Sequence, residues 1–283
     1  MKNIVLIRHG ESLGQTARQR GIDRKDVTLT DCFLSSNGIR QATELRSNKV
    51  LQRYRFDLVC TSPLSRALAT TVLGLGSMIE EERSMKQLWG QHAAAGGKAL
   101  LASPRSSRKF TPFIACADIC EFGGKIPENQ GRPLHQLRKD LKQRLSIVAR
   151  SSTTTLALDS IDFTMLPPSW PDMTMIHDGT SDRIANFLAF LQMRPEKNIA
   201  IVCHCGTIKQ MLKSTGGIDR VPNCMPIECI LTDEGELVLK SEFVATPVPS
   251  RQMGGGVRKL SKRMGGRELP LPHRQILAKS PTA

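Results

Sequence analysis

Arg8 and His9 are the first residues in this chain whose types and placement suggest chemistry, because they directly follow a run of aliphatic residues. Residues 4–7 (Ile-Val-Leu-Ile) are predicted to form a short buried strand, and ligands of open α/β sheets bind just beyond the carboxyl ends of the strands. An arginine guanidinium matches phosphate oxygens in a two-pronged hydrogen bond. A histidine beside a phosphate can attack phosphorus and form a covalent intermediate. The pair therefore predicts a phosphate clamp and a nucleophile for phosphoryl transfer.

Two later apolar runs end in residues of the same kind. One leads through Thr-Ser-Pro to Arg66 in the first turn of a predicted helix, and the other, the clearest buried-strand pattern in the chain, ends at His204. A helix N-terminus carries a partial positive charge and free N–H groups, so a cation at Arg66 favours an anionic partner there. If the three strands are neighbours, two arginines and two histidines converge at one sheet edge. His204 would then hydrogen-bond the charge that develops on the phosphoryl oxygens.

Strand and helix patterns alternate along the chain, which predicts an α/β fold: a three-layer α/β/α sandwich around a mainly parallel central sheet. Strands are expected within residues 4–8, 56–63, 110–120 and 198–206. Helices are expected within residues 35–52, 64–76, 132–149, 180–197 and 207–217, a hairpin with an Asp-Glu-Gly turn within 225–243, and a loop at 10–30.

Composition suggests one catalytic domain and a basic tail. The formal net charge is +14, and the last 33 residues hold eight Lys or Arg and one Glu, so +7 of it lies there. We expect a catalytic domain over residues 1–245, irregular insertions at about 77–110 and 151–180, and a disordered tail over 246–283. This concentration of charge in the tail argues against a nucleic-acid partner.

The chain lacks an apolar stretch of membrane-spanning length and a secretory signal pattern, so we expect a cytoplasmic protein whose eight cysteines are reduced. The run Cys203-His204-Cys205 is an unpromising metal site. Consecutive strand residues point to opposite faces, so these side chains would not reach one zinc ion.

Four segments, in order, resemble the histidine phosphatase superfamily, the phosphoglycerate mutase-like group. They are Arg-His-Gly-Glu-Ser at 8–12, the segment 31–42, Ser-Pro-Leu-Ser-Arg-Ala at 62–67 and Val-Cys-His-Cys-Gly at 202–206. The resemblance implies the histidine phosphatase fold and metal-independent hydrolysis of a phosphate monoester through a phosphohistidine, without a cofactor. His9 would be the nucleophile, and Arg8, Arg66 and His204 would bind the phosphoryl group. Gln15 stands where the family usually has a phosphate-contacting Asn, and would assist.

The family also uses a proton donor, usually a Glu beyond the third strand. Glu121 is preferred because Ile-Cys-Glu resembles the family's Leu-x-Glu; Asp118 is the competitor and Glu128 a third candidate. The substrate is expected to be a phosphorylated small molecule or a phosphoprotein. Its identity is left open, because the insertions replace much of the family's substrate-recognition region.

Two alternatives to a phosphatase stay open. Glycolytic mutases of the family carry Glu-Arg-His-Tyr-Gly after the second arginine, whereas the matching region here, residues 80–92, lacks that string, so water is the favoured acceptor. The second alternative is a catalytically weak phosphate-binding or scaffold protein. The presence of both arginines and both histidines argues against it.

Overall fold

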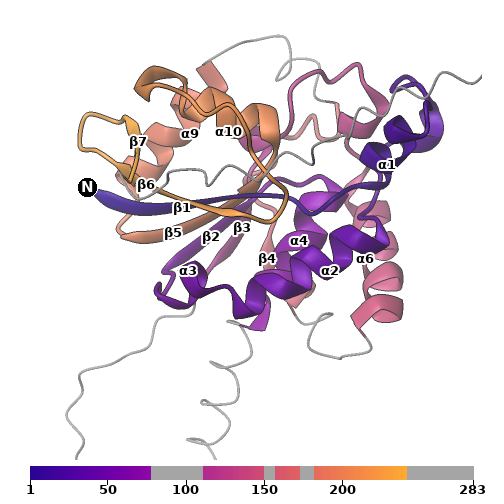
Figure 1. Cartoon of the computed structure of the whole chain (residues 1–283), viewed down its shortest axis with the longest axis horizontal. Helices are drawn as coiled ribbons and strands as arrows, with labels where there is room; N and C mark the ends of the chain where they lie inside the picture. Colours follow the sequence, from indigo (N-terminus) through magenta and orange to yellow (C-terminus); the bar gives the residue numbers. More distant parts are fainter. Residues whose placement is uncertain (78–110, 150–156, 173–181, 241–283) are drawn as a thin grey trace, which may run out of the picture. The chain divides into compact units, whose positions relative to one another are not determined.

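The computed structural model describes residues 1–77, 111–149, 157–172 and 182–240. Their strands form one sheet in the order β4-β3-β2-β5-β1-β6-β7 (Figure 1). The strands are β1 (Lys2–Arg8), β2 (Leu58–Thr61), β3 (Phe113–Ala115), β4 (Ile161–Asp162), β5 (Asn198–Cys203), β6 (Pro226–Leu231) and β7 (Leu237–Leu239). The first five strands in that order are parallel. At one edge, β6 pairs antiparallel with β1, and β7 pairs antiparallel with β6. The predicted mainly parallel sheet is confirmed.

Helices cover both faces of this sheet. One face carries α2 (Ser36–Glu44), α3 (Lys49–Gln52), α4 (Ser65–Leu75) and α6 (Leu134–Ala149), and the other carries α9 (Asp182–Met193) and α10 (Cys205–Met211) (Figure 1). The sheet has a hydrophobic core on each face, because successive side chains of β1 point to opposite faces. Val5 and Ile7 belong to the first core, and Ile4 and Leu6 belong to the second. The three-layer sandwich is therefore confirmed.

Several local predictions differ from the structure. The predicted loop at 10–30 contains α1 (Leu13–Gln19), and the helix predicted over 35–52 is broken into α2, a 3-10 turn and α3, with Asn48 capping α3. The strand predicted over 110–120 is only β3, whereas the hairpin is present as β6 and β7.

The predicted insertions and tail lie mostly beyond the described residues. Residues 78–110, 150–156, 173–181 and 241–283 are outside them, so the domain boundary near 245 stays a prediction. The part of the second insertion that is described is ordered: Leu158 and Ile161 are buried in the first core, and Ile161 begins the edge strand β4.

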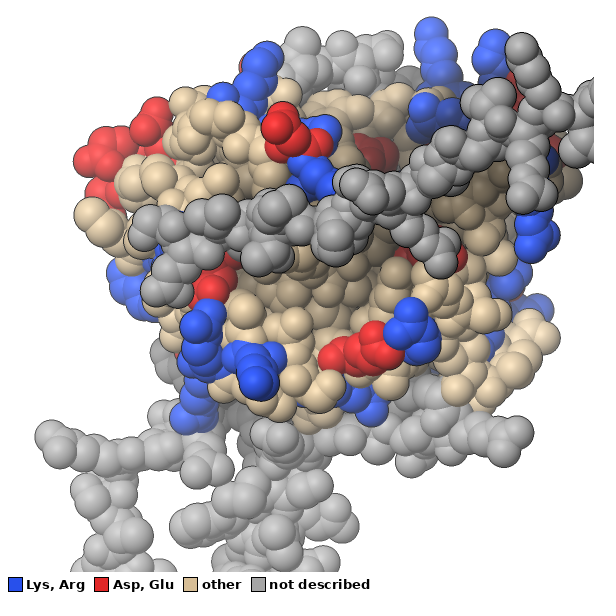
Figure 2. Space-filling model, in the orientation of Figure 1, with Lys and Arg blue, Asp and Glu red and all other residues tan. Residues whose placement is uncertain are grey.

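Within the described ranges, every helix is too short or too polar to cross a bilayer. On the face drawn in Figure 2, basic side chains occur in separate groups with acidic side chains between them.

Candidate active site

The carboxyl ends of three adjacent strands form the site. β5 lies between β2 and β1, so the residues that follow these strands meet at one edge, as the sequence predicted. His9 follows β1 and its ring centroid lies 5.1 Å from that of His204, which follows β5. Arg66 comes from the first turn of α4, directly after β2. Three parallel strands thus bring together residues that lie up to 196 positions apart, from Arg8 to His204.

His9 is buried and its two ring nitrogens have different partners. Nδ1 lies 2.7 Å from the Gly10 carbonyl oxygen, which can only accept, so Nδ1 carries the proton. Nε2 therefore holds a lone pair, and Arg66 Nε donates to it at 3.2 Å. Burial, followed by the charges of Arg66 and Arg8, lowers the pKa of His9 well below its ordinary value. The imidazole is thus neutral near pH 7, as a nucleophile requires.

Arg66 is 2% exposed, and each of its nitrogens is hydrogen-bonded. Besides His9, the guanidinium donates to the Glu128 carbonyl oxygen and, at 2.8 Å, to Asn129 Oδ1. The helix that carries Arg66 is held at its start by the buried Asp31, which accepts from Ser65 N and Ser65 Oγ at 2.7 Å each. Burying this cation is possible because each of its nitrogens has a hydrogen-bond partner and because an acidic cap secures the helix.

His204 is fully buried beside His9. Its Nε2 lies 2.8 Å from Ser62 Oγ, whereas its Nδ1 has no hydrogen-bond partner among the described residues. Burial, then the charge of Arg66, lowers the pKa of His204 well below its ordinary value. A buried nitrogen without a partner is uncommon in folded proteins and calls for an explanation such as a bound ligand.

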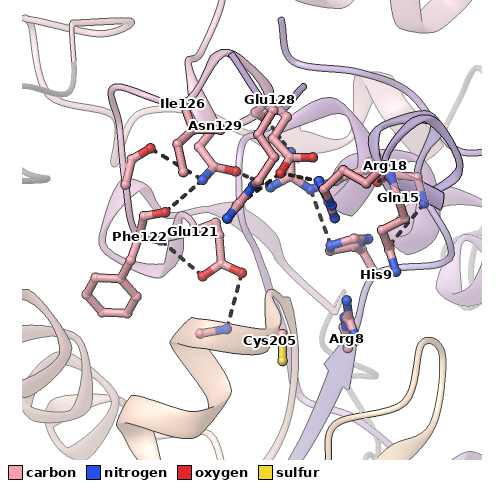
Figure 3. Close-up of a pocket in the computed structure, with 15 residues that line it drawn as sticks. Arg8, His9, Gln15, Arg18, Glu121, Phe122, Ile126, Glu128, Asn129 and Cys205 are labelled. Atoms are coloured by element: carbon pink, nitrogen blue, oxygen red, sulfur yellow. Dashed lines mark hydrogen bonds and ion pairs between the residues drawn. The ribbon is translucent and has the colours of Figure 1, made fainter. Parts of the chain in front are cut away.

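A cavity of about 480 Å³ opens at these residues (Figure 3). Its wall includes four arginines and two carboxylates, together with an apolar side made by Phe122 and Ile126. The lining residues are Arg8, His9, Ser12, Gln15, Arg18, Arg24, Arg66, Glu121, Phe122, Gly123, Ile126, Glu128, Asn129, Cys205 and Gly206. His204 and Asp118 are not among them. With both histidines neutral, the ionisable groups of this wall favour an anionic ligand.

Glu121 and Glu128 both reach the cavity and are held differently. The Glu121 carboxylate accepts from Phe122 N at 3.0 Å and from Gly206 N at 3.1 Å, so it faces the start of α10 (Figure 3). Glu128 instead accepts from Arg18 Nη1 at 2.5 Å and from Arg24 Nη2 at 3.3 Å. Glu121 is therefore the carboxylate in the cavity that is free of a cationic partner in the described structure.

Asp118, the competing candidate acid, lies away from the cavity. Its pKa is raised by burial and partly restored by Arg183. Arg183 donates to the Asp118 carbonyl oxygen at 2.6 Å and to that of Cys120 at 2.8 Å. This geometry favours Glu121 over Asp118 as the proton donor, although its catalytic role stays a prediction.

Gln15 lines the cavity, but its side chain already has partners. Its Oε1 accepts from Ser12 N at 3.1 Å, while Ser12 Oγ accepts from Gln15 N at 3.2 Å, which forms a capping box for α1. Its amide also pairs with Asn223 in both directions at 3.2 Å. Asn223 in turn donates to the His9 carbonyl oxygen at 2.6 Å. Gln15 thus supports the His9 backbone through Asn223.

Sequence reasoning missed several residues of this site. Asn129 and Asn223 support Arg66 and His9. Asn129 lies in a 3-10 helix of one turn, Pro127–Asn129, and Asn223 lies in an irregular segment, so neither is marked by a periodic pattern. Arg18 and Arg24 fall in the segment 10–30, which is predicted as a loop. The Ser12–Gln15 spacing of a capping box is the signal that could have found α1 and thus Arg18. Within the described ranges, no group of three His, Cys, Asp or Glu side chains is arranged to hold a metal ion.

Parts of this chain are similar in sequence to known proteins. Residues 4–87 match the family model of the histidine phosphatase superfamily (branch 1). A 2,3-bisphosphoglycerate-dependent phosphoglycerate mutase of Elusimicrobium minutum (strain Pei191) is 27% identical over 190 residues, which are 65% of this chain and 71% of that protein.

Solved structures with lower similarity include two phosphatases. An alpha-ribazole phosphatase from Shigella flexneri aligns with a TM-score of 0.43 and 19% identity, over 84% of this chain and 94% of that one. A phosphoserine phosphatase mutant from Entamoeba histolytica in complex with phosphoserine aligns with a TM-score of 0.42 and 20% identity, over 85% and 96%.

Proposed function

We propose that this chain, whose residues 4–87 match the histidine phosphatase superfamily, is a metal-independent phosphatase that hydrolyses a phosphate monoester through a phosphohistidine on His9. The observation that carries the proposal is the neutral, oriented His9 ring. Its Nδ1–H is fixed on Gly10 and its Nε2 lone pair lies 3.2 Å from Arg66 Nε. This nitrogen therefore sits beside a cation that could hold the phosphoryl group during attack.

In the first step, Nε2 of His9 attacks phosphorus and the bond from phosphorus to the leaving oxygen breaks. Arg8 and Arg66 bind the phosphoryl oxygens. The Arg66 N–H that donates to His9 Nε2 in the structure donates to one of these oxygens instead. The unpartnered buried Nδ1 of His204 supports a further contact there, because Ser62 can donate to Nε2 and leave the ring proton on Nδ1. Glu121 gives its proton to the leaving oxygen.

In the second step, water attacks phosphorus and the P–N bond breaks. The Glu121 carboxylate accepts the proton of the water, which restores both the acid and the free His9 ring and releases inorganic phosphate. Burial and the nearby arginines, which lower the pKa of His9, also favour this step, since they disfavour retention of positive charge on the ring.

The test is rapid-quench trapping of acid-labile phosphoprotein with p-nitrophenyl phosphate. Wild type and His135→Ala, a matched control at an exposed histidine of α6, should both label, and EDTA should leave the rate unchanged. His9→Ala should not label. Acid-labile phosphoprotein in His9→Ala would remove His9 as the nucleophile.

A mutase is the second candidate, because the curated relative from Elusimicrobium minutum is named a phosphoglycerate mutase. In that reaction the phosphohistidine returns its phosphoryl group to a sugar acid rather than to water. Supplying 3-phosphoglycerate and 2,3-bisphosphoglycerate and measuring 2-phosphoglycerate against inorganic phosphate separates the two. A flat result across a broad panel of phosphorylated metabolites and phosphopeptides would instead favour a phosphate-binding scaffold.

A further inference from the structure

Two arginines line the cavity in addition to Arg8 and Arg66, which are the pair assigned to the phosphoryl group. Arg18 lies in α1 and Arg24 follows it in the chain, so both come from the segment between β1 and α2. We infer that Arg24, supported by Arg18, recognises an anionic group on the leaving-group side of the substrate, so that the substrate is a phosphate monoester with a second negative charge such as a carboxylate. This inference rests on the proposed phosphatase activity.

The two arginines share one carboxylate oxygen. Glu128 Oε1 accepts from Arg18 Nη1 at 2.5 Å and from Arg24 Nη2 at 3.3 Å. The Glu128 side chain is 6% exposed, whereas those of Arg18 and Arg24 are 31% and 51% exposed. In the described part of the chain neither guanidinium has another side-chain partner, so most of their N–H groups are left to water or to a ligand in the cavity.

Charge counting shows which ligand would neutralise this wall. Around the phosphoryl pocket, the two cations of Arg8 and Arg66 balance a phosphate dianion, provided that Glu121 is protonated and ready to act as the acid. Around Glu128, two cations meet one carboxylate and one positive charge is left over. A leaving group with one negative charge would balance it, and a charge-assisted hydrogen bond to arginine is among the stronger polar contacts.

The two arginines differ in the part that they would play. Arg18 makes the short contact that holds the buried Glu128 carboxylate. The backbone carbonyl of Glu128 in turn accepts from Arg66. The contact from Arg24 to Glu128 is longer than that from Arg18, and the Arg24 side chain is half-exposed. Arg24 can therefore move to a ligand without leaving Glu128 unpaired. Arg24 is therefore the specificity-determining residue, and Arg18 and Glu128 position it.

The experiment compares two nearly isosteric compounds as competitors of p-nitrophenyl phosphate hydrolysis. 3-Phosphoglycerate and glycerol 3-phosphate differ in a carboxylate against a hydroxymethyl group. We expect the inhibition constant of 3-phosphoglycerate to be lower by about tenfold or more, the usual worth of a hydrogen bond to a charged group. Arg24→Gln should bring the two constants together. Arg20→Gln, at an exposed arginine outside the cavity lining, should keep the wild-type ratio.

The outcomes separate the two proposals. Equal inhibition constants in wild type, or an unchanged ratio in Arg24→Gln, overturn the second anion site while hydrolysis and His9 labelling still support the phosphatase. If p-nitrophenyl phosphate gives neither product nor acid-labile phosphoprotein, the proposed function fails and this inference fails with it.

Discussion

The Glu121 carboxylate is the residue on which the mechanism is easiest to test. Glu121→Gln keeps the size and polarity of the side chain but cannot deliver a proton, so the loss should depend on the leaving group. General acid catalysis contributes roughly 10²–10⁴-fold. The rate on an alkyl phosphate, whose leaving group is a strongly basic alkoxide, should fall by that factor. p-Nitrophenyl phosphate should still phosphorylate His9. Steady-state rates on both substrates and the nitrophenol burst measure the difference.

Asp118→Asn is the control for Glu121→Gln, because Asp118 lies outside the cavity lining. It should behave like wild type on both substrates. A leaving-group-dependent defect in Asp118→Asn together with its absence in Glu121→Gln would move the proton donor to Asp118.

At the residue scale, sequence predicts best the groups that are tied to a strand end. Arg8 ends β1, and His9 and His204 directly follow β1 and β5, so the strand pattern predicts that all three lie at strand ends. They meet because β1 and β5 are neighbours in the sheet. Glu121 and Asn223 are different, because they lie in irregular segments whose path depends on tertiary contacts. Resemblance indicated Glu121, but neither spacing nor periodicity indicated Asn223.

The loop between β3 and α6 is the element that places the acid, and Arg183 of α9 clamps it. Arg183 donates to the carbonyl oxygens of Asp118 and Cys120, and its guanidinium lies 4.0 Å from the Phe122 ring centroid. Arg183 is thus a positioning residue for Glu121, which lies between the clamped residues. Small misplacements of a catalytic group can cost about 100-fold in rate.

Arg183→Ala should therefore reproduce the signature of Glu121→Gln. We expect a loss of about 10- to 100-fold on alkyl phosphates with phosphorylation of His9 by p-nitrophenyl phosphate largely retained. Arg183→Lys should recover part of the loss because it can still donate to a carbonyl. Arg194→Ala, just beyond the other end of α9, should keep the wild-type ratio of the two substrates. An equal loss on both substrates in Arg183→Ala would argue for a general structural role.

At the element scale, long periodic helices and apolar strands were predicted, and short elements were not. Leu13–Gln19 contains one large apolar residue, so α1 has no helical periodicity and depends on its Ser12 capping box. β4 is two residues long, which is too short for an alternating pattern. Its place in the sheet depends on pairing with β3, a contact between distant parts of the chain.

The stability of the whole molecule should depend on pH because both site histidines are buried in the neutral form. Their folded pKa values lie well below the ordinary value, whereas the unfolded chain titrates near 6.5. The unfolded state therefore binds more protons below about pH 6.5, and the free energy of unfolding should fall as pH drops through that range. Two such groups give a slope of up to about 2.7 kcal/mol per pH unit.

Denaturant unfolding between pH 7.5 and 5.5 measures this slope. His204→Asn removes one titrating group and should reduce the slope by about half relative to wild type. Parallel pH dependences for wild type and His204→Asn would show that His204 does not carry the effect.

The position of β1 in the sheet has a consequence for synthesis on the ribosome. β1 pairs with β5 and β6: Asn3 lies opposite Asn198 of β5, and Ile7 lies opposite Pro226 of β6. The partner strands are therefore translated some 195 residues later, which takes roughly 10–40 s at typical elongation rates. Throughout that interval the apolar residues of β1 have no sheet partner, and pairing of such distant segments is slow in itself. A ribosome-bound nascent chain of this protein should thus be a substrate for chaperones until β5 has emerged.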